Sequence, residues 1–211
     1  MKKIKILFTV LGVMVMLSGC EFFGLELQED YEFKPRLLDP HIDMTAYEFM
    51  VSNPGGELTL MNQAVAYAGL QEEYKKPGRT FFLLHDLAVY RLNSGGDVDV
   101  NSYFGKNTVD GMPATSWEDY PVEQVRDLLL YHIVEDEYSF HNLTPDNVTT
   151  DTMLPGENGI MLLMVRNDRD SKLRINDFFG SEKVVQARTT NILSTNGPIH
   201  ILGDYAQYGK N

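Results

Sequence analysis

The sequence predicts an α+β fold in a single domain, with helices early in the chain and strands late. Two observations support this prediction. Apolar residues recur at helical spacing before residue 135, whereas short apolar runs bounded by turn residues follow residue 150. No regular alternation of strand, helix and strand is present, which argues against a doubly wound parallel sheet. The 211 residues are enough for one sizeable hydrophobic core.

The chain begins with the pattern of a secretory leader. Lys2, Lys3 and Lys5 precede a short apolar run at 6–17, and small residues follow that run. The run is shorter than the roughly 20 apolar residues that span a bilayer. We therefore expect a removed leader at this end of the chain and not a membrane-spanning helix.

The end of the leader, Leu-Ser-Gly-Cys at 17–20, resembles the lipobox of bacterial lipoproteins. It predicts a signal peptide at 1–19 and a lipidated N-terminus at Cys20, then a tether over 20–40 and a domain over 41–211. The lipid would hold the protein in the bacterial cell envelope, at the outer membrane, facing the periplasm or the exterior. In the alternative, the leader is an ordinary signal peptide and Cys20 is incidental.

Charge and cysteine content argue against several classes of function. The 30 Asp and Glu against 18 Lys and Arg give a net charge of −12. Loss of the three leader lysines leaves 15 basic against 30 acidic residues, or −15. Nucleic-acid binding needs clustered cations, and the sequence has no such cluster. Cys20 is the single cysteine, so neither a disulfide framework nor a thiolate zinc site is expected.

Local signals mark the early helices. Thr45 and Glu48 match a capping box, which predicts a short helix that ends at the Asn-Pro-Gly-Gly stretch 53–56. Apolar residues at steps of three and four predict a second helix over 58–68, with Gly69 near its end as a stop.

The middle of the chain predicts a strand, a loop and a helix. The run Thr-Phe-Phe-Leu-Leu at 80–84 is typical of a buried strand. Residues 93–120 are rich in Gly, Asn, Asp and Ser, which predicts a long loop. Pro121 then occupies a first helical position, and apolar residues follow at helical spacing up to His132.

Strands dominate after residue 150. They are predicted at 160–166, 171–176, 183–187 and 199–202. The Asn-Asp-Arg-Asp stretch 167–170 predicts a hairpin turn between the first two of these strands. Asn196 and Gly197 predict a turn before the last, because this pair favours a positive φ.

Four segments, in order, resemble the fasciclin domain family: Ala68–Leu70, Thr80–Ala88, Leu128–Val134 and Thr195–Leu202. The resemblance covers residues 44–205 and makes 93–120 an insertion. It implies a single fasciclin-like domain, a β-sandwich or wedge of about seven strands with several helices packed on one side. Within these segments, Thr80, Asn196, Gly197 and His200 are expected to be structural, since a strand histidine is usually a hydrogen-bonded core residue.

Four aromatic or imidazole side chains are candidates for contact with a partner. In some fasciclin proteins the Tyr-His region is implicated in receptor binding, which makes Tyr131 and His132 candidates, although their helical spacing also fits the core. Trp117 and Tyr120 lie in the long loop. They either contact a sugar or a protein surface, or pin the loop to the body of the domain.

No catalytic motif or metal-ligand spacing is recognised, so we expect no enzyme activity, no metal and no cofactor. The leading hypothesis is a lipid-anchored envelope protein whose fasciclin-like domain mediates adhesion by binding a cell-surface or extracellular protein or glycan. An accessory glycan-binding lipoprotein of a nutrient-uptake complex is the alternative, with Trp117 as a stacking platform. A hydrolase assembled from distant residues remains a third hypothesis. The oligomeric state stays open.

Overall fold

The computed structural model describes residues 39–52, 55–166 and 172–207. The elements below belong to one compact unit, Pro40–Asn211. The predicted signal peptide, Cys20, most of the tether and the turn at 167–170 lie outside the described residues. Among the described residues, no helix is long and apolar enough to cross a bilayer.

Helices and strands follow the predicted order, with one early strand. The α-helices are α2 (Ala46–Ser52), α3 (Thr59–Ala68), α4 (Asp86–Val89), α5 (Tyr103–Lys106) and α6 (Val122–Tyr131), with 3-10 turns η1 (Glu73–Lys75), η2 (Trp117–Asp119) and η3 (Glu157–Gly159). The strands are β1 (Thr80–Leu84), β2 (Ile133–Val134), β3 (Val148–Asp151), β4 (Ile160–Val165), β5 (Leu173–Ile175), β6 (Val185–Ser194) and β7 (Gly197–Leu202).

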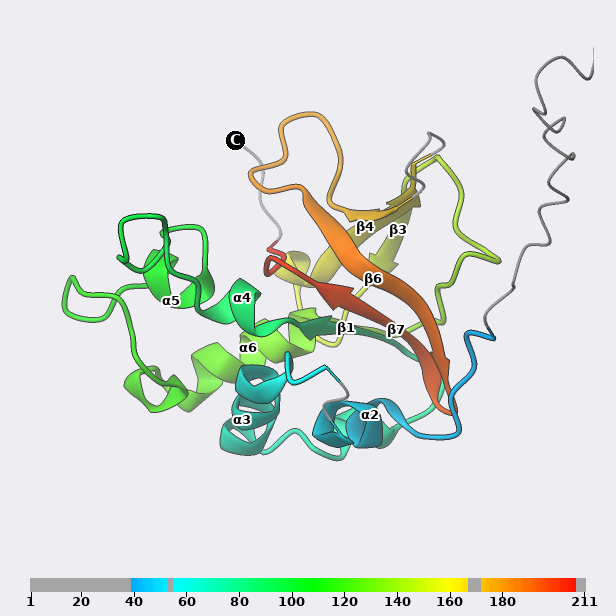
Figure 1. Cartoon of the computed structure of the whole chain (residues 1–211). Coiled ribbons are helices and arrows are strands. Elements are labelled where there is room, and N and C mark those ends of the chain that lie inside the picture. The colour runs from blue at the N-terminus through cyan, green and yellow to red at the C-terminus, as the bar shows by residue number, and fades with distance from the viewer. Residues whose placement is uncertain (1–38, 53–54, 167–171, 208–211) are drawn as a thin grey trace, which may run out of the picture. The chain divides into compact units, whose positions relative to one another are not determined.

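Within the described residues, the seven strands form one sheet in the order β2-β1-β7-β6-β5-β4-β3. All pairs are antiparallel except β1 and β7. The long strand β6 pairs with β5 near its start and with β7 over the rest of its length, so it links the two halves of the sheet. Helices α2, α3 and α6 gather on one side of β1 and β7 (Figure 1). The predicted α+β class, strand number and helix placement are confirmed.

The helix boundaries form where the local signals predict them. The Thr45 backbone N–H donates to the Glu48 carboxylate at 2.7 Å, and the Glu48 N–H donates to the Thr45 hydroxyl at 3.2 Å, which completes the capping box of α2. Helix α3 ends at Gly69 with a left-handed backbone, φ 66°, and the Leu70 N–H bonds the Val65 carbonyl at 3.0 Å.

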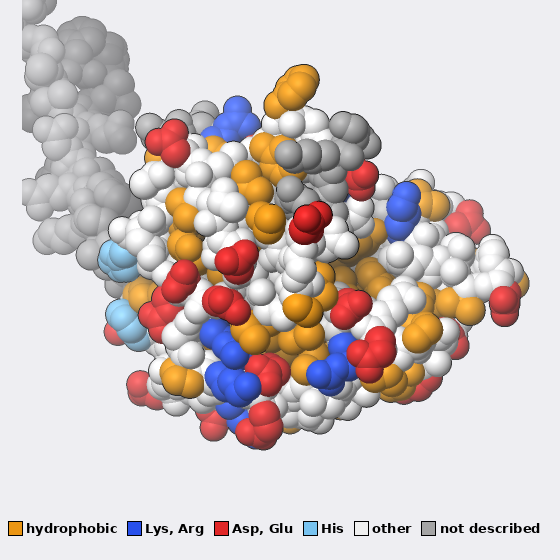
Figure 2. Space-filling view, turned by 180° about the vertical axis from the view of Figure 1, so that it is seen from behind, with side chains coloured by type: hydrophobic (Ala, Val, Ile, Leu, Met, Phe, Trp, Pro, Cys, Tyr) orange, Lys and Arg blue, Asp and Glu red, His pale blue; other side chains and the backbone are white. Residues whose placement is uncertain are grey.

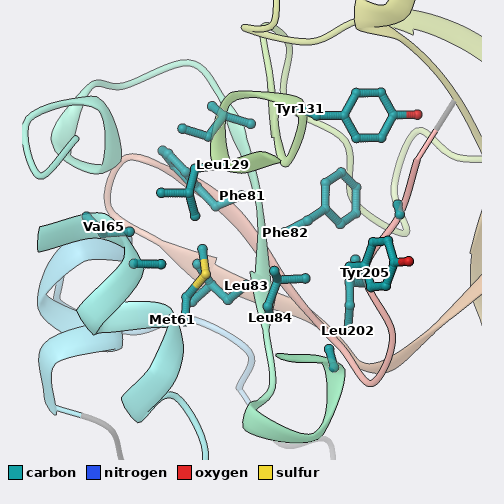
Figure 3. Close-up of a cluster of buried hydrophobic side chains, with 14 of the residues drawn as sticks. Met61, Val65, Phe81, Phe82, Leu83, Leu84, Leu129, Tyr131, Leu202 and Tyr205 are labelled. Atoms are coloured by element: carbon teal, nitrogen blue, oxygen red, sulfur yellow. The ribbon is translucent and has the colours of Figure 1, made fainter. Parts of the chain in front are cut away.

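Strand β1 runs through the core. All five of its residues are buried, because β2 and β7 flank it and helices cover it. Figure 3 shows Met61 and Val65 of α3 and Leu129 of α6 directed toward β1, in a cluster of fully buried side chains. The apolar run at 80–84 and the apolar stripe of α3 therefore meet in one core.

The turn of the β6–β7 hairpin lies one residue earlier than the predicted Asn-Gly turn. The turn residues are Thr195 and Asn196, whereas Gly197 already belongs to β7 and pairs with Ser194. Gly197 has a φ of 140°, and a Cβ atom there would collide with the carbonyl oxygen of Arg79. Close approach of a neighbouring backbone, together with this φ, thus explains the glycine.

The segment 93–120 also differs from the expected loop. It contains α5 and η2, each with its own N-terminal capping. The Ser102 hydroxyl accepts from the Gly105 N–H at the start of α5, and Asp119 accepts from the Ser116 N–H at η2. The missing periodicity reflects elements of only three or four residues, which are too short to show a hydrophobic period.

Candidate functional site

Asn196 ties three parts of the chain together, as expected for a structural residue. Its Oδ1 accepts from the Ala46 N–H at 2.7 Å and from the Ser194 hydroxyl at 3.0 Å. Its Nδ2 donates to the carbonyls of Tyr74 at 3.0 Å and Lys76 at 3.1 Å. The side chain is buried, so these bonds join the start of α2, the η1 region and the β6–β7 turn.

His200 is a core residue of β7. Its Nδ1 accepts from the Asn191 N–H at 3.2 Å, and its Nε2–H donates to the Tyr138 carbonyl at 2.9 Å. The ring stacks on Phe82 of β1 with centroids 5.4 Å apart. Burial lowers the pKa of His200 to about 4, so the imidazole is neutral at neutral pH.

Thr80 secures the same segment from β1. Its hydroxyl donates to the Asp136 carbonyl at 2.6 Å and accepts from the Tyr138 N–H at 2.7 Å. Tyr138 is therefore bonded to both Thr80 and His200, which fixes the chain that leaves β2. These contacts agree with a structural role for Thr80.

The structure places Tyr131 and His132 in the core. The His132 Nδ1–H donates to the Leu128 carbonyl at 2.7 Å, and Nε2 accepts from the Ala206 N–H at 3.0 Å. The Tyr131 hydroxyl accepts from the Asn176 amide at 2.8 Å. Tyr131 is 4% exposed and His132 is 0% exposed. Burial thus contradicts the prediction that this pair contacts a receptor directly, because His132 is enclosed and only a small part of Tyr131 is exposed.

Trp117 and Tyr120 are buried as well, with 2% and 4% of their surface exposed. The Trp117 Nε1–H donates to the Leu60 carbonyl in α3 at 2.8 Å, and the Tyr120 hydroxyl donates to the Asn107 carbonyl at 2.7 Å. The Trp117 ring meets Phe104 edge to face at 4.9 Å. The stacking platform predicted at Trp117 is therefore wrong, and the alternative, that these rings pin 93–120 to the body, is correct.

Replacing Trp117 by Phe is expected to lower the free energy of unfolding by about 1 to 2 kcal/mol. The Leu60 carbonyl would lose its donor, and the smaller ring would leave unfilled volume. Urea unfolding followed by circular dichroism measures the change. The matched control is Phe179→Ala, at a fully exposed aromatic side chain, with an expected change below about 0.5 kcal/mol. Wild-type stability in Trp117→Phe would contradict the pinning role.

Two adjoining cavities remain open to a ligand. The first, of about 300 Å³, lies between α5, α6, the η3 region and the C-terminal segment, and its lining includes Asn107, Gln124, Asp127, Tyr131, Asn158 and Tyr205. The second, of about 280 Å³, is lined by Val100, Asn101, Lys106, Glu182, Lys183, Tyr205 and Gln207. Tyr205 and Gln207 line both cavities.

Apart from Tyr131, sequence reasoning missed these residues because they come from segments far apart in the chain. No spacing pattern links α5 and α6 to η3 or to the C-terminal segment, and the individual residues are ordinary polar types. In Figure 2 the surface is hollowed between the part that carries α5, at the right, and the rest of the domain. Only tertiary packing brings these segments together.

The second cavity carries an unusual lysine. The Lys183 ammonium lies 3.4 Å from the centroid of the Tyr205 ring, a cation–π contact. Burial lowers its pKa to about 8; Asp204 opposes this shift, whereas Arg91 and Lys106 add to it. Lys106 stands at the end of α5 and lines the same cavity.

The site offers hydrogen-bonding and charged groups but no recognisable metal centre. Among the described residues, no group of three or more His, Cys, Asp or Glu side chains is arranged to hold a metal ion. The groups that line the cavities are amides, tyrosine side chains, a few carboxylates and two ammoniums. Such an arrangement suits reversible binding of a polar ligand.

Comparison with known proteins identifies the fold. No family model and no curated protein matches the chain. Among solved structures, the chain is similar to a FAS1 domain pair from the insect cell adhesion molecule fasciclin I, at 15% identity and a TM-score of 0.51. The match covers 77% of this chain and 50% of that structure, so the chain spans about half the length of the matched pair. The fasciclin-like fold that the sequence motifs imply is thus confirmed.

Proposed function

We propose that the protein is a lipid-anchored component of the bacterial cell envelope whose FAS1-like domain mediates adhesion by binding a protein or glycan, without catalysis. The proposal rests mainly on one observation: a FAS1-like fold follows a lipobox-like segment in the chain. The matched structure comes from a cell adhesion molecule, which supports an adhesive role for this fold. The lipobox-like segment that ends at Cys20 supports attachment through a lipid.

Charge supports the lipid as the means of attachment. The mature chain would carry −15, and anionic headgroups repel an acidic protein. The visible face in Figure 2 shows acidic side chains spread among basic ones, with no broad basic patch that would bind a membrane. Acyl chains at Cys20 would supply the affinity that the surface charge does not.

Replacing Cys20 by Ser is expected to release the protein from the membrane fraction. Wild-type cells fed a radiolabelled fatty acid should label the protein, and ultracentrifugation should recover it with membranes. The Cys20→Ser protein should be unlabelled and soluble. An unlabelled wild-type protein, or a variant that stays with the membrane, would count against lipid anchoring. Protease treatment of intact cells then separates surface display from a periplasmic location.

Adhesion is tested with the full chain displayed on cells. Cells that produce the wild-type protein should bind saturably to an immobilised extracellular protein or envelope glycan. Cells with Cys20→Ser provide the matched control, because the domain is produced without its anchor. Absence of saturable binding across both classes of partner would overturn the adhesive role.

A further inference from the structure

The two ammoniums of the second cavity have no carboxylate partner within the described part of the chain. Lys106 and Lys183 make no ion pair there at 4.0 Å or less, whereas Lys75 and Lys76 each pair with a glutamate. In a chain with a net charge of −12, two adjacent unpaired cations are conspicuous. An anion would relieve their mutual repulsion.

Two carboxylates, Asp204 and Glu182, lie near these lysines without forming an ion pair with them at 4.0 Å or less. Asp204 attracts Lys183, but its Oδ1 lies 3.6 Å from an Arg91 nitrogen. Arg91 also pairs with Asp99 at 2.8 Å. The Glu182 carboxylate accepts from the Gln207 amide at 3.4 Å. The lining of the second cavity thus holds two ammoniums against the single Glu182 carboxylate, a positive balance that favours an anion.

The first cavity has the groups that recognise a polyol. The amides of Gln124 and Asn158 both donate and accept, and the exposed Asp127 carboxylate accepts from hydroxyls. Leu128 and Leu154 supply apolar wall, on which the carbon face of a sugar ring packs. A volume of about 300 Å³ is at the lower end of small-molecule sites and suits one sugar unit.

The walls of the first cavity are held in place before a ligand arrives. The buried amide of Asn176 donates to the Tyr131 hydroxyl and to the Gln207 carbonyl, both at 2.8 Å. Its Oδ1 accepts from the Leu162 N–H at 3.1 Å. Gln124 in turn donates to the Tyr103 hydroxyl at 3.1 Å. A site held in this way loses less conformational entropy when a ligand binds.

We propose that the two cavities on either side of Tyr205 form one groove that binds an acidic oligosaccharide, a sugar chain that carries carboxylate or sulfate groups. One sugar unit occupies the first cavity, and the acidic group of the next unit lies against Lys106 and Lys183. This assignment rests on the proposed binding function and names the class of glycan that it recognises.

Calorimetric titration of the full-length protein in detergent micelles tests the groove. The probes are oligogalacturonate, which carries carboxylates, dextran sulfate, which carries sulfates, and neutral dextran of matched length. We expect at least one acidic probe to bind at least tenfold more tightly than dextran, with affinity that falls as salt is added. The tighter acidic probe identifies the acidic group.

Substitutions then assign the binding to these residues. Lys183→Gln should weaken acidic binding at least tenfold, and Lys183→Arg should retain most of it because the charge remains. Lys76→Gln removes an exposed lysine charge elsewhere and should change nothing. Asn158→Ala should weaken binding at the first cavity, and Gln186→Ala, at an exposed position of β6, is its control. Circular dichroism confirms that each variant is folded.

Several results would overturn the inference. They are equal affinity for dextran and both acidic probes, no loss in folded Lys183→Gln, and a loss in Lys76→Gln equal to that in Lys183→Gln. Lack of binding to all three probes, with saturable cell adhesion to a protein partner intact, overturns the glycan groove and leaves the proposed adhesive function standing. Lack of both probe binding and cell adhesion overturns the glycan groove and the proposed adhesive function together.

Discussion

Acidification from pH 6.5 to pH 4 is expected to lower the free energy of unfolding by about 5 kcal/mol, through His132 and His200 alone. Burial lowers the pKa of each to about 4 in the folded protein, against a usual value of 6.5. Each pKa unit corresponds to about 1.4 kcal/mol; because the unfolded histidine is already half protonated at pH 6.5 and the folded one at pH 4, each contributes roughly 2.5 kcal/mol over this range. This loss is comparable to the whole stability of a typical domain.

The direction follows from which state takes up protons. Well above pH 6.5 both histidines are neutral in the folded and unfolded states, and they then cause no loss of stability. Between pH 6.5 and 4 the unfolded chain binds up to two more protons than the folded protein, so stability falls. Lowered pKa values of Glu48, Glu73, Asp99 and Asp119 place the loss of their contributions at lower pH, below the usual carboxyl pKa.

The hydrogen bonds explain why neither imidazole accepts a second proton easily. In His132 the nitrogen that would take the proton faces the Ala206 N–H, and in His200 it faces the Asn191 N–H. Protonation would turn that acceptor into a donor opposite another donor. The cost of burying a charge is therefore joined by the loss of a hydrogen bond.

Urea unfolding between pH 7 and pH 4.5 measures the effect. The slope of the unfolding free energy against pH should approach the value for uptake of two protons on unfolding in the wild type. In His200→Gln it should approach the value for one proton. His141→Gln, at an exposed histidine, is the control and should retain the wild-type slope. A wild-type slope in both His132→Gln and His200→Gln would refute the assignment.

The sequence was informative where the signal was local. The Thr45 capping box, the Gly69 stop and the apolar run at 80–84 each depend on neighbouring residues, and each appears in the structure. Strand β3 was missed because Val148–Asp151 is mostly polar, and β2 because it has only two residues. Strand β2 exists through pairing with β1, far earlier in the chain, and β3 through pairing with the following strand β4; the composition of the two segments does not reveal either pairing.

The candidate site was less predictable. Conspicuous residue types directed attention to Trp117 and to the Tyr-His pair, but rings of this size are also the best core fillers, and the fold buries them. The exposed groove is instead lined by common types such as Gln124, Asn158 and Lys183. Their proximity depends on how α6, η3 and the start of β6 pack, which the sequence pattern does not reveal.

Replacing Asn196 by Ala is expected to lower the free energy of unfolding by about 4 kcal/mol. The Ala46 N–H and the carbonyls of Tyr74 and Lys76 would each lose a partner. An unsatisfied buried polar group costs about 1 to 3 kcal/mol, and the side chain is only 4% exposed, so water does not readily replace these bonds. Urea unfolding at pH 7, where the two buried histidines do not contribute to the difference, measures the change.

Asn142→Ala is the matched control for this prediction. Asn142 also makes two side-chain bonds, accepting from the Ser139 N–H at 2.8 Å and donating to the Glu137 carbonyl at 2.7 Å, but it is exposed. Water replaces its contacts, so a loss near 1 kcal/mol is expected. Equal losses of unfolding free energy in the two variants would show that burial does not increase the contribution of the Asn196 hydrogen bonds.

Amide hydrogen exchange separates a local from a global role for Asn196. Its bonds join the first residue of α2 to the η1 region and to the β6–β7 turn, so their loss should loosen all three at once. We expect faster exchange in Asn196→Ala across α2 and the turn, with the amides of β4 protected as before. Asn196→Asp keeps the acceptor for Ala46 but sets a carboxylate against two carbonyls, so α2 should stay more protected than the η1 region. Equal protection of α2 and the η1 region in Asn196→Asp would contradict the assignment of Oδ1 to α2 and of Nδ2 to the η1 region.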